Sequence, residues 1–208
     1  MNRQAFTLTE VLVALGIAGL LLVALAGFVR SARGAAVSAE TTSETTATIR
    51  LASELLREEL HLAGSAPWPV PAGAGAVEGL EGAQTAAQFL AQGLEVRPSP
   101  GGHALRLVYI DDRVAGRPVA RQLTFEAATD GQGQPQLYRR SGSSPRQPWV
   151  AGVESMTVVG AVSVTGELLG SAALPGNRLR GLWLELRSGA EVASVLLELP
   201  HRPLGVAP

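Results

Sequence analysis

Residues 6–29 read FTLTEVLVALGIAGLLLVALAGFV, and this stretch decides the fold of the first part of the chain. From Val11 to Val29, nineteen consecutive residues carry no charge. At a rise of about 1.5 Å per residue, a helix of this length covers about 28 Å, close to the hydrocarbon thickness of a bilayer. The carboxylate of Glu10 stands directly before the run. The sequence therefore predicts a membrane-spanning helix with an acidic residue at its start.

The charge of Glu10 is costly in this position. At mid-bilayer depth a carboxylate costs about 2.5–3.5 kcal/mol, and less near the interface. No basic residue stands within a helical turn of Glu10 in the sequence, Arg3 being the nearest. A buried carboxylate is tolerated when it meets an equally buried ammonium group. We therefore expect the positive partner of Glu10 to be on another molecule.

The N-terminal pattern resembles that of type IV pilins and of the pseudopilins of type II secretion. These proteins have a short basic leader, a small residue, then Phe-Thr-Leu-x-Glu and about twenty apolar residues; here the leader ends at Ala5, where the family usually has Gly, and Arg3 is its basic residue. The resemblance implies cleavage between Ala5 and Phe6 by a prepilin peptidase, which also methylates the new amino group of Phe6. It further implies that Glu10 meets the amino terminus of a neighbouring subunit during assembly.

The same resemblance implies a location and partners. The chain would sit in the inner membrane with a single pass, in contact with lipid, and its head would lie outside the cytoplasm. From there an assembly platform would move it into a pilus at the cell surface or a periplasmic pseudopilus, where it contacts other pilins through its N-terminal helix.

Two other interpretations of the segment stay open. A plain single-span anchor explains its length but not Glu10. A secretory signal peptide explains Ala24-Leu25-Ala26, an A-x-A-like cleavage site, and cleavage after Ala26 would release a soluble exported binding protein that begins at Gly27. The n-region would then contain Glu10 and a single Arg, whereas a typical n-region is positively charged.

Composition limits the remaining functions. The chain of 208 residues has no cysteine, which excludes disulfides and cysteine-based metal or redox sites. A net charge of −1 argues against a nucleic-acid binder that acts through its overall charge. The part that follows residue 64 is long enough to bury a core unaided.

The helix is predicted to continue into water as a stem. Apolar residues recur at intervals of three and four over residues 49–63, which indicates an amphipathic helix that ends near Gly64. They are Ile49, Ala52, Leu55, Leu56, Leu60 and Ala63. An ordinary helix inside a soluble domain would share these residues, and the two interpretations differ on whether residues 30–48 are helical. We predict a leader at 1–5, a transmembrane and stem helix at 6–64 and a β-rich head at 65–208.

The head is predicted to be an antiparallel sheet with one face on the stem, which makes the fold class α+β. A long helix packed on such a head resembles the pilin fold. Residues 65–102 are rich in Pro, Gly and Ala and contain one short helical stretch, 83–92. Alternating patterns then predict strands. These cover 105–109, 119–125, 136–140, a long one at 149–159, and a hairpin of 182–186 with 195–199. The segments Trp149–Met156 and Arg180–Leu186 resemble the larger minor pilins and pseudopilins of the W and J types.

Enzymatic and cofactor chemistry finds little support in the sequence. The histidines, His61, His103 and His201, are scattered without the spacing of metal ligands. Asp111-Asp112 and Asp130-Gly131 are typical of turns. The glycines at 73, 75 and 79 lack the preceding strand and the later acidic residue of a dinucleotide site. We therefore expect no catalytic residue, no cofactor and no metal.

One patch suggests a partner. Tyr138, Arg139, Arg140, Arg146 and Trp149 combine aromatic rings with arginines, as surfaces that bind single-stranded DNA do. The alternative is an exposed strand end with solvated arginines. DNA contact through this patch is a hypothesis.

Overall fold

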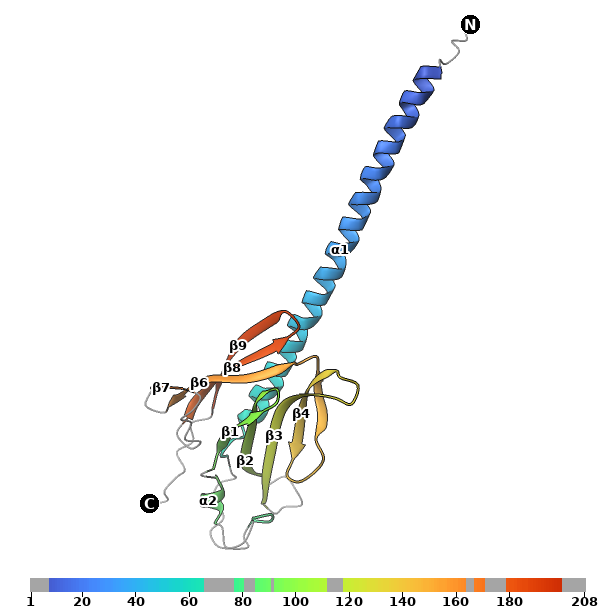
Figure 1. Cartoon of the computed structure of the whole chain (residues 1–208). Coiled ribbons are helices and arrows are strands. Elements are labelled where there is room, and N and C mark those ends of the chain that lie inside the picture. The colour runs from blue at the N-terminus through green and yellow to red at the C-terminus, as the bar shows by residue number, and fades with distance from the viewer. Residues whose placement is uncertain are drawn as a thin grey trace. The chain divides into compact units, whose positions relative to one another are not determined.

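A computed structural model describes residues 8–65, 77–80, 85–90, 92–111, 118–163, 167–170 and 179–199. The chain divides into two compact units, residues 1–44 and 45–208. The predicted α+β architecture is confirmed: a long helix is followed by a head with a nine-stranded sheet (Figure 1). The elements are α1 (Leu8–Leu60), α2 (Ala86–Leu90), β1 (Leu94–Ser99), β2 (Gly102–Asp111), β3 (Val119–Thr129), β4 (Pro135–Ser141), β5 (Gln147–Ala151), β6 (Ser155–Ser163), β7 (Leu168–Gly170), β8 (Leu179–Ser188) and β9 (Glu191–Glu198).

Helix α1 is continuous through residues 30–48, as the stem interpretation predicts. Its Ser- and Thr-rich part stays helical because these residues are weak helix formers rather than breakers. The hydroxyl of Thr41 finds its hydrogen-bond acceptors within the helix, the backbone carbonyls of Val37 and Ser38, at 3.2 and 2.9 Å. The helix ends at Leu60, and a turn leads to Gly64, which has a φ of 68°.

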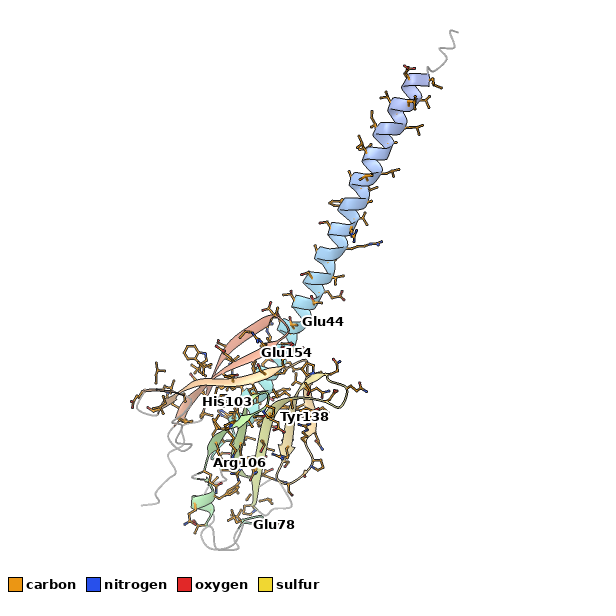
Figure 2. The ribbon with its side chains drawn as sticks, in the orientation of Figure 1. Glu44, Glu78, His103, Arg106, Tyr138 and Glu154 are labelled. Carbon is orange, nitrogen blue, oxygen red and sulfur yellow. The ribbon has the colours of Figure 1, made fainter. Side chains whose placement is uncertain are left out.

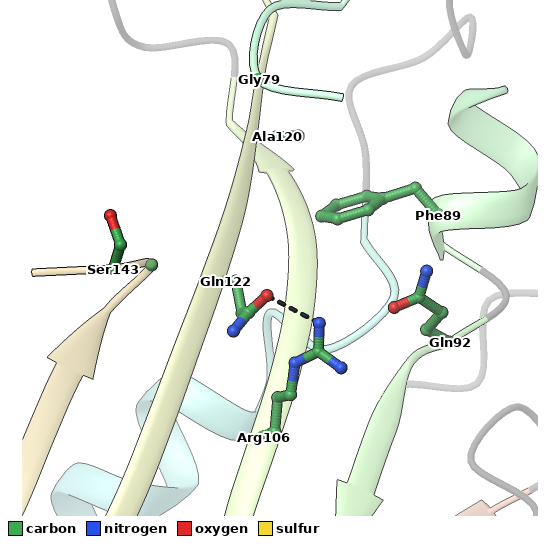
Figure 3. Close-up of a pocket in the computed structure, with 8 residues that line it drawn as sticks. Gly79, Phe89, Gln92, Arg106, Ala120, Gln122 and Ser143 are labelled. Carbon is green, nitrogen blue, oxygen red and sulfur yellow. Dashed lines mark hydrogen bonds between the residues drawn. The ribbon is translucent and has the colours of Figure 1, made fainter. Parts of the chain in front are cut away.

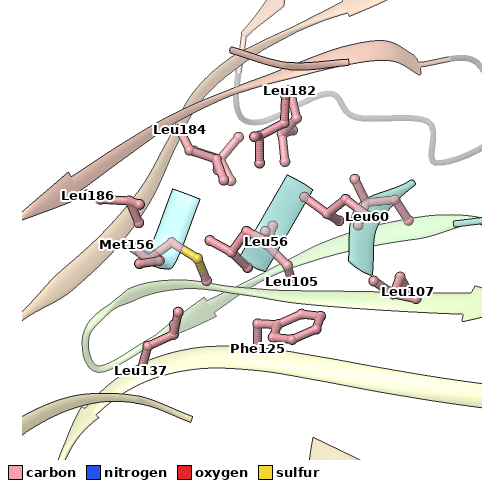
Figure 4. Packing of buried hydrophobic residues seen from close by; sticks show 14 of the residues in the cluster. Leu56, Leu60, Leu105, Leu107, Phe125, Leu137, Met156, Leu182, Leu184 and Leu186 are labelled. Carbon is pink, nitrogen blue, oxygen red and sulfur yellow. The ribbon is translucent and has the colours of Figure 1, made fainter. Parts of the chain in front are cut away.

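The C-terminal part of α1 packs into the head through the predicted stripe. Ile49, Ala52, Leu56 and Leu60 are buried, and Leu55 and Ala63 pack at the edge of the same core. Figure 4 shows Leu56 and Leu60 among leucines of β2 and β8. Each leucine removed from water contributes about 1.5–3 kcal/mol, so this packing is the main attachment of the stem to the sheet.

The sheet has the strand order β5-β4-β3-β2-β6-β8-β9, with β1 added to β2 and β7 to β6. Between these strands all pairings are antiparallel except that of β2 with β6, where Gly102 pairs with Met156 in parallel. The predicted antiparallel sheet is confirmed for the other strand pairs, and this parallel junction was not predicted. Sequence alternation predicts strands but not which strands lie side by side, and β6 returns to β2 only after the β3–β5 meander.

Two further strand predictions need correction. The long strand predicted at 149–159 is broken, because Gly152 adopts a φ of 86° and donates its N–H to the carbonyl of Pro135. The predicted strand is instead divided between the end of β5 and the beginning of β6. Strands β1 and β7 were not predicted, because β1 contains Pro98 and β7 has only three residues. The predicted hairpin of β8 and β9 is confirmed, with Leu182 opposite Leu197 and Leu184 opposite Val195.

A second, smaller core lies under α2, on the opposite face of β2. The odd-numbered leucines of β2 face the main core, while Val108 and Ile110 pack with Phe89 and Leu90. Helix α2 begins with a capping box in which Thr85 and Gln88 exchange hydrogen bonds. It is shorter than the predicted stretch 83–92, of which residues 83, 84 and 91 lie outside the described ones.

Candidate functional site

The N-terminal segment places Glu10 in the first turn of α1. A carboxylate suits this position because the N-terminus of a helix carries a partial positive charge. The side chain of Glu10 is exposed. Ala5 and Phe6, where cleavage and methylation are predicted, lie outside the described residues.

The helix that follows Glu10 exposes apolar side chains over its whole surface. From Leu8 to Val29 every described residue is exposed, including the leucines at 12, 15, 20, 21, 22 and 25. A helix that is hydrophobic all round belongs in a core or a membrane. By length and composition, α1 is the one helix of the described chain suited to cross a membrane.

Comparison with protein families addresses this same segment. Residues 1–26 match the model of the prokaryotic N-terminal methylation motif. The chain carries the prokaryotic N-terminal methylation motif. This motif is the signature of type IV pilins and pseudopilins, so the resemblance seen at Phe6–Glu10 is confirmed for the N-terminal segment. Searches of curated proteins and of solved structures found no match. The methylation motif thus covers the predicted leader and most of the apolar run, and the W and J resemblance of the head stays a prediction.

The structure divides the predicted arginine patch between the two faces of the sheet. Arg139 lies opposite Phe125 and forms an ion pair with Glu59 of α1, Nη2 to Oε1 3.1 Å. Trp149 is partly buried and packs on the ring of Phe125, with centroids 4.9 Å apart. Both residues therefore face the stem.

The other members of the patch lie on the outer face. Tyr138 (Figure 2) lies opposite Glu126, and Arg146 stacks its guanidinium 4.4 Å above the Tyr138 ring. Arg146 also approaches Glu126, Nη1 to Oε1 3.7 Å. Arg140 is exposed on this outer face. Successive side chains of a strand point to opposite faces of the sheet. The residues predicted to contact a partner, Arg139, Arg140, Arg146 and Trp149, therefore cannot bind one ligand together from a single face.

The histidines are not gathered into one site. His61 is exposed in the turn after α1, while His201 lies outside the described residues. His103 (Figure 2) accepts a hydrogen bond at Nδ1 from the backbone N–H of Val158, at 3.1 Å. Within the described ranges, no three His, Asp or Glu side chains form a group that could hold a metal ion.

The predicted turn at Asp130 is confirmed. Its Oδ1 accepts from the backbone N–H groups of Gln132 and Gln134, both at 2.8 Å. This carboxylate is therefore used to fold the chain back from β3 into β4.

A cavity on the outer face of the sheet was not predicted (Figure 3). It has a volume of about 380 Å³ and lies between α2, strands β2 and β3, and the turn after β4. It is lined by Gly79, Phe89, Gln92, Arg106, Ala120, Gln122, Gly142 and Ser143. The lining comes from five separate segments, so no local pattern in the sequence could reveal it.

Arg106 is the charged group of the cavity. Its Nη1 donates to Oε2 of Glu95 at 2.9 Å, and its Nη2 donates to Oε1 of Gln122 at 2.7 Å. Glu95 also accepts a hydrogen bond from Arg97. This hydrogen bond and, to a smaller extent, the one from Arg106 lower the pKa of Glu95, although burial acts in the opposite direction. Two guanidinium groups thus share one carboxylate, which leaves the cluster of Glu95, Arg97 and Arg106 with a net positive charge.

Proposed function

We propose that the protein is a structural minor subunit, of the W/J kind, of a type IV pilus or a related filament, and that it is not an enzyme. The observation that carries the proposal is the methylation motif at residues 1–26, followed by an exposed apolar helix that joins a β-rich head. The size of the head and the two segments that resemble W and J pilins support a minor role. Such a subunit would support pilus assembly, with roles in twitching motility, adhesion or DNA uptake.

The proposed mechanism begins in the inner membrane, with the head outside the cytoplasm and the leader, residues 1–5, still attached. A prepilin peptidase removes the leader before Phe6 and methylates the new terminus. The assembly platform then brings Glu10 to the terminal amine of a neighbouring subunit. The apolar residues 11–29 leave lipid and pack against other helices, since both environments remove them from water. In the proposed division, residues 6–64 form the transmembrane and stem segment, which contains α1, and residues 65–208 form the head.

The mass of the N-terminal peptide tests this proposal, on protein purified from its native membrane. We expect a terminus at Phe6 with one additional methyl group. A terminus at Gly27 would instead show a soluble exported protein cleaved after Ala26, and Glu10 would then have no role. An intact Met1 would show an unprocessed anchor and would contradict filament assembly.

A pseudopilin of type II secretion is the second candidate, because the methylation motif occurs in both kinds of protein. A deletion strain separates the two. We expect loss of surface pili with normal export of enzymes. Loss of export with normal pili would assign the protein to secretion.

DNA contact through the arginine patch stays a prediction with a test of its own. Arg139 and Arg146 already face carboxylates, which reduces the charge available to phosphates. Replacing Arg139, Arg140 and Arg146 by Ala should lower DNA binding and transformation if the patch serves DNA uptake. Unchanged values would reject the contact.

A further inference from the structure

We propose that Trp183 of one copy of this chain docks into the Arg106 cavity of a second copy, in a head-to-tail contact that can repeat. The inference rests on the proposed function, because a filament requires contacts that repeat between heads. It adds a pair of surfaces that the N-terminal motif does not provide. One surface is an exposed aromatic side chain, and the other is the cavity of Figure 3.

Among the aromatic side chains of the head that the structure describes, Trp183 is the exposed one, with 44% of its surface accessible. On the outer face of the sheet it lies between Gly160 of β6 and Leu196 of β9, which is 48% exposed. Gly160 offers no side chain to cover the indole. Val159, at a bulge beside Gly160, and Leu168 of β7 extend the apolar surface. Exposed patches of this kind mark interaction sites, and Trp is enriched where such contacts are strongest.

Carboxylates flank this indole on the same face. Glu185 follows two residues after Trp183 on β8, and Glu198 stands two residues after Leu196 on β9. Residues two apart on a strand point to the same face. Glu198 is exposed and Glu185 is partly exposed. Arg187 shares this face but lies beyond Glu185, farther along β8 from the ring. Because the two carboxylates are nearer the ring, the partner of Trp183 should present positive charge around the cavity that receives it.

The Arg106 cavity has these properties. Its volume of about 380 Å³ lies at the small end of the range of about 300–1,000 Å³ typical of sites for small organic groups, which suits an indole. The guanidinium of Arg106 is held in place by Glu95 and Gln122, and arginine binds the face of a tryptophan ring favourably. The carboxamide of Gln92 and the hydroxyl of Ser143 offer acceptors for the indole N–H.

Positive charge also lies beside the cavity. Arg106, Thr124 and Arg140 form one row across β2, β3 and β4, since Arg106 lies opposite Thr124 and Thr124 opposite Arg140. Arg140 is exposed and shares the outer face with Arg146. These arginines complement Glu185 and Glu198, which argues for a second copy of this chain as the occupant rather than a neutral ligand.

The two surfaces belong to different parts of the sheet. The Arg106 cavity, which we call the socket, lies on β2 and β3 with α2. Trp183, which we call the knob, lies on β8 beside β9, and β6 separates the two. One copy can therefore offer both surfaces at once. A heterologous contact of this kind does not close on itself unless its rotation happens to do so, and it generates open chains.

Site-directed cross-linking tests the contact. Because the chain has no cysteine of its own, only the introduced cysteines can react. Two full-length copies with different tags are expressed together in the membrane, one with Ser143→Cys at the socket and one with Ser194→Cys, which lies opposite Glu185 beside the knob. A short bismaleimide should join them. Thr129→Cys replaces Ser143→Cys in the control, because it lies seven residues from Gln122 along β3, about 23 Å away.

Two variants then test the docking itself. Trp183→Ser removes the knob, and Gln92→Trp fills the socket from an exposed position. Each should lower the cross-link yield at least about tenfold, while Trp183→Phe should retain part of it. Circular dichroism would confirm that the variants fold. A yield unchanged by both variants, or no higher than that of the Thr129→Cys control, would overturn the contact. The N-terminal peptide mass would be unaffected, so failure here is distinct from failure of the proposed function.

Discussion

Gly101 lies where the fold leaves no room for a side chain. A Cβ added there would collide with the backbone carbonyl of Ala127, and one added at the adjacent Gly102 would come 2.6 Å from the carbonyl oxygen of Met156. Backbone atoms move only together with the strands that carry them. These two glycines therefore permit the close approach of β2 to its neighbours.

We predict that Gly101→Ala lowers the free energy of unfolding by about 3 kcal/mol or more, through overpacking against backbone. Urea denaturation followed by tryptophan fluorescence measures the loss. Gly131→Ala is the matched control, because an added Cβ there meets nothing within 4 Å. It should change stability by less than about 0.5 kcal/mol. Equal effects of the two substitutions would contradict the close approach.

Tyr109 gives the head a sensitivity to alkaline pH. Burial raises the pKa of its phenol above 10.0, and the carboxylates of Glu59 and Asp111 raise it further. A group whose pKa is raised by folding favours the native state below its unfolded pKa, and this contribution is lost as pH rises through the folded value.

We therefore expect the free energy of unfolding to fall from about pH 10 upward, where unfolded tyrosine begins to ionise. Unfolding curves measured between pH 8 and the alkaline limit would show the decline. Tyr109→Phe should remove this part of the decline. A Tyr109→Phe protein with the same alkaline slope as the parent would show that another group is responsible.

At the scale of elements, the stem owes its place in the head to four fully or nearly buried side chains. Leu56 has no exposed surface, whereas Leu51, on the other side of the same helix, is 50% exposed. The two residues are chemically identical and separated by less than two turns. They therefore isolate burial from helix propensity.

We predict that Leu56→Ala destabilises the protein by about 2–5 kcal/mol, through lost burial and the cavity that remains. Leu51→Ala should cost less than about 0.5 kcal/mol. Thermal or chemical unfolding of the two variants gives the comparison. Similar losses at both positions would mean that the helix is not packed as described.

The elements that sequence reasoning predicted well are those with a strong, local pattern. The three- and four-residue spacing from Ile49 to Ala63 placed the buried face of α1 correctly, and alternation placed β2, β3, β8 and β9. It failed where one residue overrides the pattern, as Gly152 does between β5 and β6. The division of Arg139 from Arg146 needed the strand register and the position of Glu59 on α1, and neither is local in the sequence.

At the scale of the whole molecule, the N-terminal motif has a direct test in Glu10. We predict that Glu10→Gln still inserts and is still cleaved before Phe6, because the cleavage position and the apolar run are unchanged. Incorporation into filaments should fall at least about tenfold, since an ammonium group from a neighbour would be buried without its counter-charge.

Electron microscopy of filaments and immunoblots of the sheared fraction measure the effect. Glu40→Gln is the control, because Glu40 is an exposed carboxylate on the same helix, beyond the apolar run. It should assemble normally. Normal assembly of Glu10→Gln would remove the assembly role of this charge.

The junction of β2 with β6 has a mechanical meaning. Long ladders hold the strands on either side, yet the register across the junction is the single pair Gly102 and Met156, helped by the imidazole of His103 on the N–H of Val158. The buried residues of α1 share one core with strands from both sides of this junction. The helix therefore holds the two halves of the sheet together. While it stays packed, force on the head is shared by both halves. Without it, the hydrogen bonds that join β2 to β6 in the described residues are those around the Gly102–Met156 pair, including Met156 N–H to the carbonyl of Gly101, and the one from Val158 to His103.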